Sequence, residues 1–344
     1  MPGARNRPFV VPIFLPHAGC PHRCVFCNQS LITGVNSTIS AVDVRDSVET
    51  FLKYKSGRRG IVQIAFFGGN FLGIEMDEIR RMLAEAAVFV EAGRVDSIRF
   101  STRPDTIDSE RLDIIKNFPV ATIELGVQSM DDRVLSATKR GHSSSDTLRA
   151  IQHLKEFDYE IGVQLMVGLP GDDPERLLAS ARRLAKLKPG FIRIYPTVVL
   201  EGSLLATWYR KGDYVPLRIE EAVSQAKNLY LLFKSENIRV IRMGLQASED
   251  LEKGSTIIAG PYHPAFGHLV YSEIFLNMAM SAIKSAPPKG GRVGLHVHPH
   301  SVSKMRGLKN GNIKKLRGKF HLQSIEIVAD DSLREDQLAV TTYL

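Results

Sequence analysis

Short apolar runs alternate with segments of helical periodicity along the first 245 residues. A run of about four to eight apolar residues bounded by glycine, proline or polar clusters is typical of a strand, whereas apolar positions that recur about every three to four residues are typical of a helix. The runs predict strands at residues 10–15, 61–67, 97–101, 121–127, 161–167 and 191–195. The segments between them predict helices at residues 40–54, 75–90, 109–117, 144–157 and 174–187.

The strict order of strands and helices predicts an α/β fold. Strand–helix–strand units in series form parallel sheets, and a long series favours a barrel or partial barrel. In such barrels the loops at the carboxyl ends of the strands carry the chemistry. We therefore predict a partial (β/α)6 TIM-like barrel over residues 1–250, with a further helix at residues 219–233 and a final strand beside the barrel at residues 238–243.

A change in composition after residue 250 predicts a second, smaller unit. Residues 254–266 have the composition of a loop, and a helix is predicted at residues 269–283. The Pro-Pro and Gly-Gly pairs within residues 287–291 mark a predicted subdomain junction. Beyond it we predict strands at residues 293–298 and 324–329 with a basic helical region between them, so that residues 251–344 form a small C-terminal α+β appendage.

All three cysteines of the chain lie directly after the first predicted strand. Cys20, Cys24 and Cys27 follow the spacing C-x3-C-x2-C, and three thiolates so close together must converge on one small object. A zinc ion usually takes four ligands in two pairs. A [4Fe–4S] cluster held by three thiolates leaves one iron without a protein ligand, free to bind something else.

A zinc site and an exported protein are the alternatives to this interpretation. His17 or His22 would complete a zinc site. The odd number of cysteines argues against a disulfide. The sequence Ala-Gly-Cys ending at Cys20 is similar to a lipoprotein cleavage site, but the apolar run before it is short and is broken by Pro12, so we expect no export. No apolar run is long enough to span a bilayer, and we expect a cytoplasmic protein without a membrane partner.

Polar residues and glycines follow several of the other predicted strands. The candidate ligand-binding residues in these positions are Gly68, Gly69, Asn70, Ser101, Glu124, Gln128 and Gln164. Paired glycines allow the backbone to approach a ligand closely. Glu124 and Gln164 lie within apolar strands, where an unpaired polar group costs free energy. Each needs either a polar cofactor inside the barrel or a hydrogen bond to a neighbouring loop.

Four further motifs follow the cysteines in order, namely Thr-Arg-Pro-Asp at 102–105, Glu-Leu-Gly-Val-Gln-Ser at 124–129, Lys-Arg-Gly-His at 139–142 and Gly-Leu-Pro-Gly at 168–171. With the cysteine spacing, they resemble the radical S-adenosylmethionine (SAM) superfamily. Within it, they look like the catalytic subunit of the elongator complex, which modifies wobble uridine in tRNA. The similarity covers roughly residues 8–245. Oxygen-independent coproporphyrinogen oxidases, which share the barrel plan, are more distant.

The resemblance implies that the three cysteines bind a [4Fe–4S] cluster and that its open iron binds SAM. An electron from an external donor would cleave SAM to a 5′-deoxyadenosyl radical, which abstracts hydrogen from the substrate. The implied SAM contacts are the backbone beside Phe26 near the adenine, Gly68 and Gly69 on the amino group, Gln128 on the ribose, Arg140 on the carboxylate, and Gln164 on the ribose or methionine part. Ser101 stands where porphyrinogen oxidases have a glutamate.

One departure limits the transfer of function. Elongator subunits carry an acetyltransferase domain after the barrel, whereas the residues after Gly254 are too few for one and lack an acetyl-CoA loop pattern. We therefore expect a radical SAM enzyme whose substrate is not identified, with RNA or tRNA as one class. A small molecule, as in the porphyrinogen oxidases, is the other class.

Positive charge is concentrated in the C-terminal part. The formal net charge is +8, and residues 284–319, which begin at Lys284 and end at Lys319, hold ten Lys/Arg and no Asp or Glu. Such a surface binds phosphates, so RNA or another polyanion is a candidate partner, while a solvated charged face is an equally good interpretation.

The same part contains His296, His298 and His300 at strand spacing, which predicts that the three imidazoles share one face. A metal site there is less favoured than a basic surface strand. A nucleic-acid-binding protein with a structural metal is accordingly the alternative to an enzyme.

Overall fold

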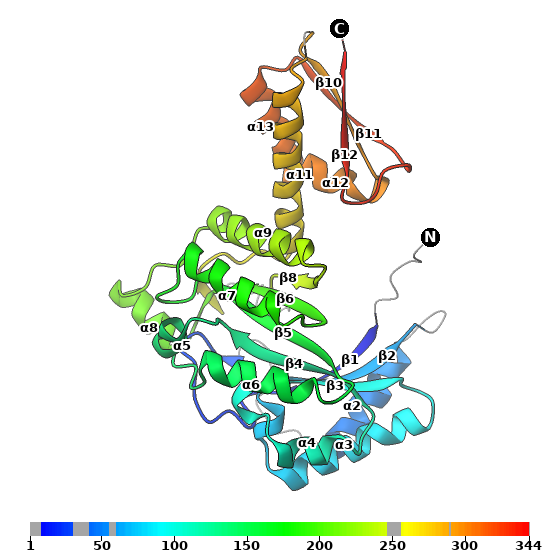
Figure 1. Cartoon of the computed structure of the whole chain (residues 1–344), viewed down its shortest axis with the longest axis vertical. Coiled ribbons are helices and arrows are strands. Elements are labelled where there is room, and N and C mark those ends of the chain that lie inside the picture. The colour runs from blue at the N-terminus through cyan, green and yellow to red at the C-terminus, as the bar shows by residue number, and fades with distance from the viewer. Residues whose placement is uncertain (1–7, 30–40, 55–59, 246–255, 289, 344) are drawn as a thin grey trace.

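Seven parallel strands form the central sheet of the computed structural model, which describes residues 8–29, 41–54, 60–245, 256–288 and 290–343. The strands pair in chain order, as β1 (Phe9–Leu15), β2 (Val62–Gly68), β3 (Ser97–Thr102), β4 (Val120–Gln128), β5 (Glu160–Val167), β6 (Phe191–Pro196) and β8 (Arg239–Met243). Within the described residues β1 and β8 remain the two edges, so the curled sheet is an open half-barrel (Figure 1).

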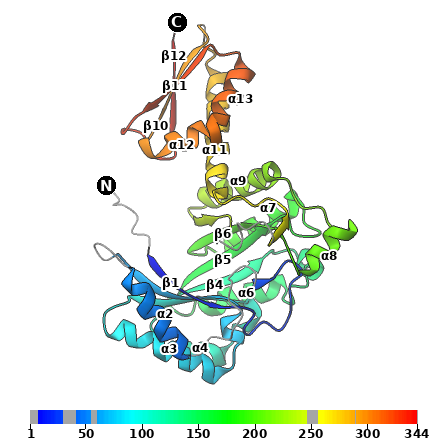
Figure 2. The same ribbon diagram turned by 180° about the vertical axis from the view of Figure 1, so that it is seen from behind.

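Helices cover the outer face of this sheet (Figures 1 and 2). They are α2 (Ala41–Lys53), α3 (Met76–Glu91), α4 (Ser109–Ile115), α5 (Asp132–Ala137), α6 (Ser144–Leu154), α7 (Pro174–Lys186) and α9 (Ile219–Ser235). Alternate strand residues such as Val11, Ile64 and Ile123 are fully buried in the core that the sheet shares with these helices. Because side chains alternate between the two faces of a strand, the residues between them, many of them polar, face the inner side of the half-barrel.

The structure confirms the predicted fold. All six predicted strands and all five predicted helices are present, and residues 238–243 supply β8 as the seventh strand. Helix α8 (Leu204–Lys211) and the antiparallel pair β7 (Val199–Leu200) and β9 (Ile257–Ala259) were not predicted from the sequence. The two strands of that pair are too short to show a periodicity.

The C-terminal part forms a second core around one long helix, α11 (Phe266–Ser285). Phe266 and Val270 at its start belong to the core of the half-barrel, whereas Phe275 and Ile283 belong to the second core. That core is completed by β10 (Arg292–Val297), α12 (Val302–Arg306), α13 (Gly311–Phe320), β11 (Ser324–Ala329) and β12 (Leu338–Tyr343). β10 lies between β11, its parallel neighbour, and β12, its antiparallel neighbour.

Two predictions about this part need comment. Residues 287–291 were predicted to be a subdomain junction, and this is wrong, because Ile283 before them and Val293 after them pack in the same core. The sequence analysis also missed β12. The predicted boundary between residues 250 and 251 lies outside the described residues. None of the described helices combines the length and the apolar composition needed to cross a bilayer.

Candidate active site

The cysteine loop, residues 16–29, leaves the carboxyl end of β1 and is closed by His17 and Gln29. The backbone N–H of His17 donates to Gln29 Oε1 at 2.5 Å, and the backbone N–H of Gln29 donates to His17 Nε2 at 3.1 Å. Within the loop, Cys24 is buried and Cys20 and Cys27 are half-buried. The three cysteines therefore lie in one closed loop at the carboxyl edge of the sheet, where barrels of this kind carry their chemistry.

Asn70, which is fully buried, ties this loop to the rest of the edge. Its backbone N–H donates to the carbonyl of Ala18 and its Nδ2 donates to the carbonyl of Gly19, both at 2.8 Å. Its Oδ1 accepts hydrogen bonds from Thr102 Oγ1 at 2.7 Å and from the backbone N–H of Arg103 at 2.9 Å. Asn70 was predicted to be a ligand-binding residue, and this stays a prediction. In the structure, Asn70 joins three loops: the cysteine loop, the loop after β2 and the loop after β3.

Glycines allow the cysteine loop and the loop after β2 to touch through their backbones. A Cβ at Gly69 would lie 2.7 Å from the carbonyl oxygen of Leu15, and a Cβ at Gly19 would lie 2.6 Å from the carbonyl carbon of Gly73. Gly68 has a φ of +106°, which a side chain rarely tolerates. The paired glycines thus have a packing reason of their own, and their predicted contact with SAM stays a prediction.

The middle of the cysteine loop is held from the other side by Val25. Its N–H donates to the carbonyl of Thr138 at 3.1 Å, and its carbonyl accepts from the N–H of Leu205 at 2.8 Å. The ring of Phe26 packs against the apolar cluster of Val25, Val199, Leu205, Ala206 and Tyr214. The side chain of Phe26 therefore supports the loop, and the predicted contact of its backbone with adenine stays a prediction.

Arg140 and Gln128 meet at the carboxyl end of β4. Arg140 Nη1 donates to Cys24 Sγ at 3.3 Å, and its Nη2 donates to the carbonyl of Gly126 at 2.5 Å. Gln128 follows a register shift in the β4–β5 ladder, has a φ of +68°, and has a buried Oε1 without a partner among the described residues. Such a backbone costs about 1–3 kcal/mol, and a buried unpaired oxygen adds to that cost. Both features are typical of a ligand site.

Burial changes the acidity of the thiols. Burial first, and then the sulfurs of Cys24 and Cys20, raise the pKa of Cys27 to about 12. Burial also raises the pKa of Cys20, and the positive charge of Arg140 opposes that shift. Thiols with raised pKa values stay protonated at neutral pH unless a cation compensates them. The site therefore suits a group that supplies strong positive charge to all three sulfurs, as the iron of a cluster does.

Glu124 joins several strands on the inner face. Its fully buried carboxylate is paired with Arg99 and with Arg193, whose Nη2 donates to Glu124 Oε1 at 3.1 Å and whose Nε lies 2.6 Å from Glu124 Oε2. Gln164 Nε2 lies 3.4 Å from Glu124 Oε2 and 3.5 Å from Ser101 Oγ. The protein itself thus satisfies the carboxylate. Sequence reasoning missed both arginines, although each interrupts an apolar strand just as Glu124 does.

His142 is a further residue to which sequence reasoning gave no role. It is buried, and neither ring nitrogen makes a well-formed hydrogen bond in the described part of the chain. Burial first, and then the charge of Arg140, lower the pKa of His142 to about 3, so the ring is neutral at pH 7. The signal was present, because His142 ends the Lys-Arg-Gly-His motif that also contains Arg140.

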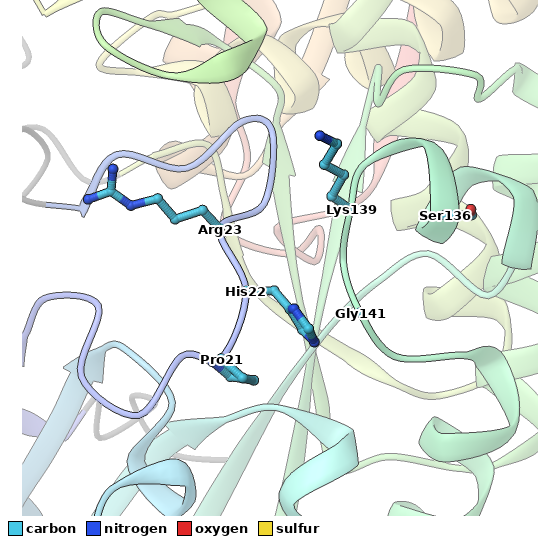
Figure 3. Close-up of a pocket in the computed structure, with 6 residues that line it drawn as sticks. All are labelled: Pro21, His22, Arg23, Ser136, Lys139 and Gly141. Carbon is cyan, nitrogen blue, oxygen red and sulfur yellow. The ribbon is translucent and has the colours of Figure 1, made fainter.

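A pocket of about 470 Å³ opens beside the cysteine loop (Figure 3). The ring of His22 points toward Gly141, whose missing side chain makes room for it. His17 Nε2 already accepts the N–H of Gln29. Of the two histidines that would complete a zinc site, His17 is therefore engaged within the loop, whereas His22 is exposed and lines the pocket. The residues that line this pocket are Pro21, His22, Arg23, Ser136, Lys139 and Gly141.

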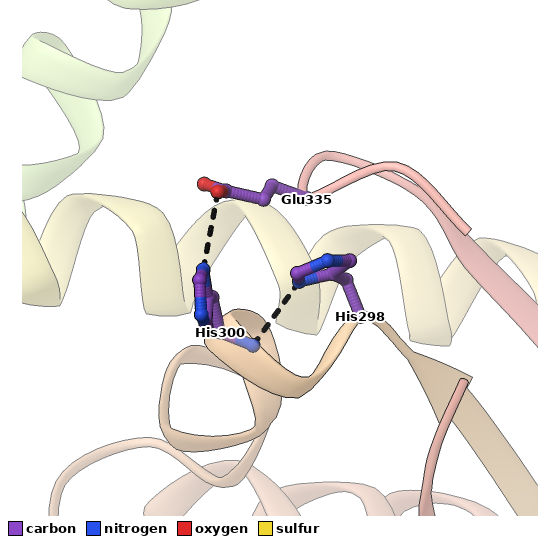
Figure 4. A group of neighbouring side chains, drawn as sticks. All are labelled: His298, His300 and Glu335. Atoms are coloured by element: carbon purple, nitrogen blue, oxygen red, sulfur yellow. Dashed lines mark hydrogen bonds and ion pairs between the residues drawn. The ribbon is translucent and has the colours of Figure 1, made fainter. Parts of the chain in front are cut away.

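The C-terminal histidines do not share one strand face, so that prediction is wrong, because β10 ends at Val297. His296 pairs with Thr341 at 2.9 Å. His298 Nδ1 accepts the N–H of His300 at 3.1 Å, and His300 Nδ1 lies 3.3 Å from Glu335 Oε1 (Figure 4). Possible ligand atoms of His298, His300 and Glu335 lie within 4.8 Å of one another. However, accepting a bond at Nδ1 places the proton of a neutral ring on Nε2, so the turn accounts for His298 without a metal ion.

Comparison with known proteins places this geometry in a family. Residues 14–184 match the radical SAM superfamily, and residues 189–275 match the radical SAM C-terminal domain. The tRNA uridine(34) acetyltransferase of Methanocaldococcus jannaschii is 27% identical over 266 residues, which are 64% of this chain and 48% of that protein. The chain thus spans about half the length of the tRNA uridine(34) acetyltransferases that it matches.

Two solved structures share the fold. The archaeal Elp3 of Methanocaldococcus infernus has a TM-score of 0.60 and 22% identity, covering 77% of this chain and 62% of that one. Coproporphyrinogen III oxidase (HemN) of Escherichia coli, a radical SAM enzyme, has a TM-score of 0.50 and 16% identity, covering 67% and 53%. Because the two adjacent family models together cover most of its length, the chain belongs to the radical SAM superfamily, whose members are enzymes.

Proposed function

We propose that the cysteine loop holds a [4Fe–4S] cluster through Cys20, Cys24 and Cys27, and that SAM binds beside it at the carboxyl edge of the half-barrel. Members of the superfamily use an iron–sulfur cluster and SAM. When bound and reduced by an external one-electron donor, the cluster supplies the electron that cleaves SAM to a 5′-deoxyadenosyl radical for hydrogen abstraction. The observation that carries the proposal is the closed loop with its three sulfurs and with Arg140 donating to Cys24.

The number of sulfurs supports a cluster over a single zinc ion. A structural zinc ion usually takes four ligands, whereas a [4Fe–4S] cluster held by three thiolates keeps one iron open for a further ligand. His17, one candidate for a fourth zinc ligand, already accepts the N–H of Gln29 at its Nε2.

Residues near the cysteine loop provide the contacts to SAM and hold the loop in place. Arg140 offsets the negative charge of a thiolate at Cys24 and has a buried Nε without a partner in the described residues, which suits the carboxylate of SAM. The unpaired Oε1 of Gln128 suits a hydroxyl donor such as that of a ribose. Asn70 and Gly69 keep the cysteine loop in place against the loops after β2 and β3.

We infer that RNA is the substrate class. The curated relative from M. jannaschii is named for a tRNA uridine. On the appendage, we define the α12–α13 surface as six exposed cations, none with a carboxylate partner in the described part of the chain. They are Arg306, Lys309, Lys314, Lys315, Arg317 and Lys319. Exposed unpaired cations at this density attract a phosphate backbone.

The cluster assignment is tested by Cys20→Ala, with His22→Ala as its matched control in the same loop. After anaerobic reconstitution, the Cys20→Ala protein should lose the visible absorption of the cluster and should form no 5′-deoxyadenosine from SAM and dithionite. The His22→Ala protein should retain both. Wild-type protein that binds stoichiometric zinc in place of iron, or that loses its metal on His22→Ala, contradicts the proposal.

A further inference from the structure

Arg193 and Arg242 stand side by side on the inner face of the half-barrel. They are direct partners in the parallel ladder between β6 and β8, so their side chains leave the sheet on the same side. Like charges placed opposite each other destabilise a sheet. The electrostatic repulsion between these two guanidinium groups therefore lowers the stability of the fold unless an opposite charge compensates it.

The buried carboxylate that faces this pair does not neutralise both arginines. Glu124 is the buried carboxylate within reach, and it is shared between Arg99 and Arg193. Arg242 has no carboxylate partner in the described part of the chain. Tyr195 lies within electrostatic reach of Arg193 and Arg242 and contributes a phenol hydroxyl rather than a carboxylate. This part of the inner face therefore has three guanidinium groups for one carboxylate.

Arg242 is held in place without being neutralised. Its Nε donates to the carbonyl of Gly244 and its Nη2 to the carbonyl of Leu245, both at 3.1 Å. These neutral acceptors orient the guanidinium and leave its other N–H groups for a ligand. Burial first, and then the charge of Arg193, lower the pKa of Arg242, while Tyr195 opposes that shift. A half-buried, like-charged and pre-oriented guanidinium gains free energy when an anion arrives.

The surroundings of Arg193 indicate what kind of molecule approaches. Its guanidinium reaches across the half-barrel to the ring of Phe67 on β2, at 5.9 Å from the ring centroid. Phe67 lies 6.4 Å from Phe14 on β1. These aromatic and arginine side chains are half-buried, unlike the fully buried aliphatic residues that alternate with them. The inner face therefore offers both apolar surface and positive charge.

We propose that Arg193 and Arg242 form a binding site for an oxyanion, a phosphate or carboxylate group carried by the substrate. The proposal rests on the proposed function, because that function makes the inner face the substrate side. Arg193 and Arg242 lie on β6 and β8, whereas Arg140 and Gln128, which are proposed to contact SAM, meet at the carboxyl end of β4. Gln164, another predicted SAM contact, is the ladder partner of Arg193 on β5. The oxyanion site restricts the substrate to molecules that carry such an anion within reach of β6 and β8.

The test measures the binding of inorganic phosphate to the full-length protein by titration calorimetry, with acetate as the carboxylate arm and chloride at equal ionic strength as the reference. Arg242→Gln should weaken the binding of the preferred anion by about tenfold or more, since it removes charge-assisted hydrogen bonds. Arg239→Gln is the matched control, because Arg239 lies on the same strand but is exposed and paired with Glu160. It should bind the anion as the wild type does.

Two further arms distinguish this site from the SAM site and from a general effect of positive charge. Arg242→Lys keeps the charge but loses the planar fork, so it should bind with intermediate affinity; it also covers the case in which Arg242→Gln does not fold. Titration of the reconstituted protein with SAM present should give the same affinity for phosphate. The proposal is overturned if Arg242→Gln binds the anion as tightly as the wild type does. It is also overturned if the addition of SAM abolishes the binding of phosphate. Because anion binding is also measured before reconstitution, its failure is distinct from a failure of the cluster assignment.

Discussion

The half-barrel and the C-terminal appendage differ in how charged side chains are buried and paired. In the half-barrel, the carboxylate of Glu124 is fully buried and is shared by Arg99 and Arg193. In the appendage, the cations of the α12–α13 surface are exposed and lack carboxylate partners in the described residues. Buried polar groups are interdependent, because removing one leaves another unpaired in a medium of low dielectric constant. Exposed charges act almost independently and are screened by salt.

This difference predicts how large the effect of a substitution is in each region. At the carboxyl edge of the half-barrel, a change of one methyl group should propagate to the cysteines, because the loops there touch through their backbones. On the appendage, whole charges must be reversed for a measurable effect, and the effect should depend on ionic strength.

The largest effect is expected for Gly69→Ala. Its Cβ would lie 2.7 Å from the carbonyl of Leu15 and closer still to that of Ala18, and backbone atoms cannot swing aside. We expect a loss of about 1–3 kcal/mol in the free energy of unfolding, as for overpacking elsewhere, and a much lower iron content after reconstitution. Iron analysis and chemical denaturation measure these two quantities.

Gly318→Ala on α13 is the control for this change. A Cβ there meets no atom within 4 Å, and alanine favours a helix over glycine by about 0.5–1 kcal/mol. Iron loading should stay at the wild-type level. A Gly69→Ala protein that loads iron as the wild type does would show that the contact between the two loops is dispensable.

A smaller effect is expected for the double variant Lys314→Glu/Lys315→Glu. Both lysines are exposed on α13, and their reversal should weaken tRNA binding by about tenfold at low salt and reduce the slope of log K against log salt. Filter binding across a salt series measures both. The charge-matched control is Lys116→Glu/Lys188→Glu, two exposed lysines of the half-barrel that are paired with Asp113 and Glu236. Equal weakening by both double variants would deny the α12–α13 surface any special role.

The smallest effect concerns Asp172, a carboxylate of the half-barrel whose buried Oδ2 has no partner in the described residues. Burial first, and then the charges of Asp173 and Asp131, raise its pKa from 3.8 to about 7. Between these two pH values the folded state binds more protons than the unfolded state, so its contribution to stability falls as the pH rises toward 7. Asp172→Asn should therefore be more stable than the wild type by about 1–2 kcal/mol at pH 8.

This gain should shrink as the pH falls toward 4, because the wild-type carboxyl group is then protonated and neutral like the amide. Thermal unfolding of the two proteins between pH 4 and pH 8 provides the measurement. A stability difference that is constant over this range would mean that the carboxylate is solvated in the folded protein.

Much of the half-barrel could be predicted from the sequence, because the information is local. The alternation of apolar runs with helical segments shows in stretches such as residues 161–167 and 174–187, and strict alternation leaves few topologies open. The cysteine loop was equally visible, since three cysteines within eight residues must act together. The elements missed were short, as with β7, or lay at the end of the chain, as with β12.

The partners of the buried polar groups were decided by the tertiary structure. That Glu124 meets Arg99 and Arg193, and that Arg193 stands beside Arg242, depends on the registers of four ladders that join five strands, and three of these ladders contain a shift. A shift of one residue turns a side chain to the other face of the sheet. The type of a residue indicates that a buried charge needs a partner. Only the register of distant strands determines which residue that partner is.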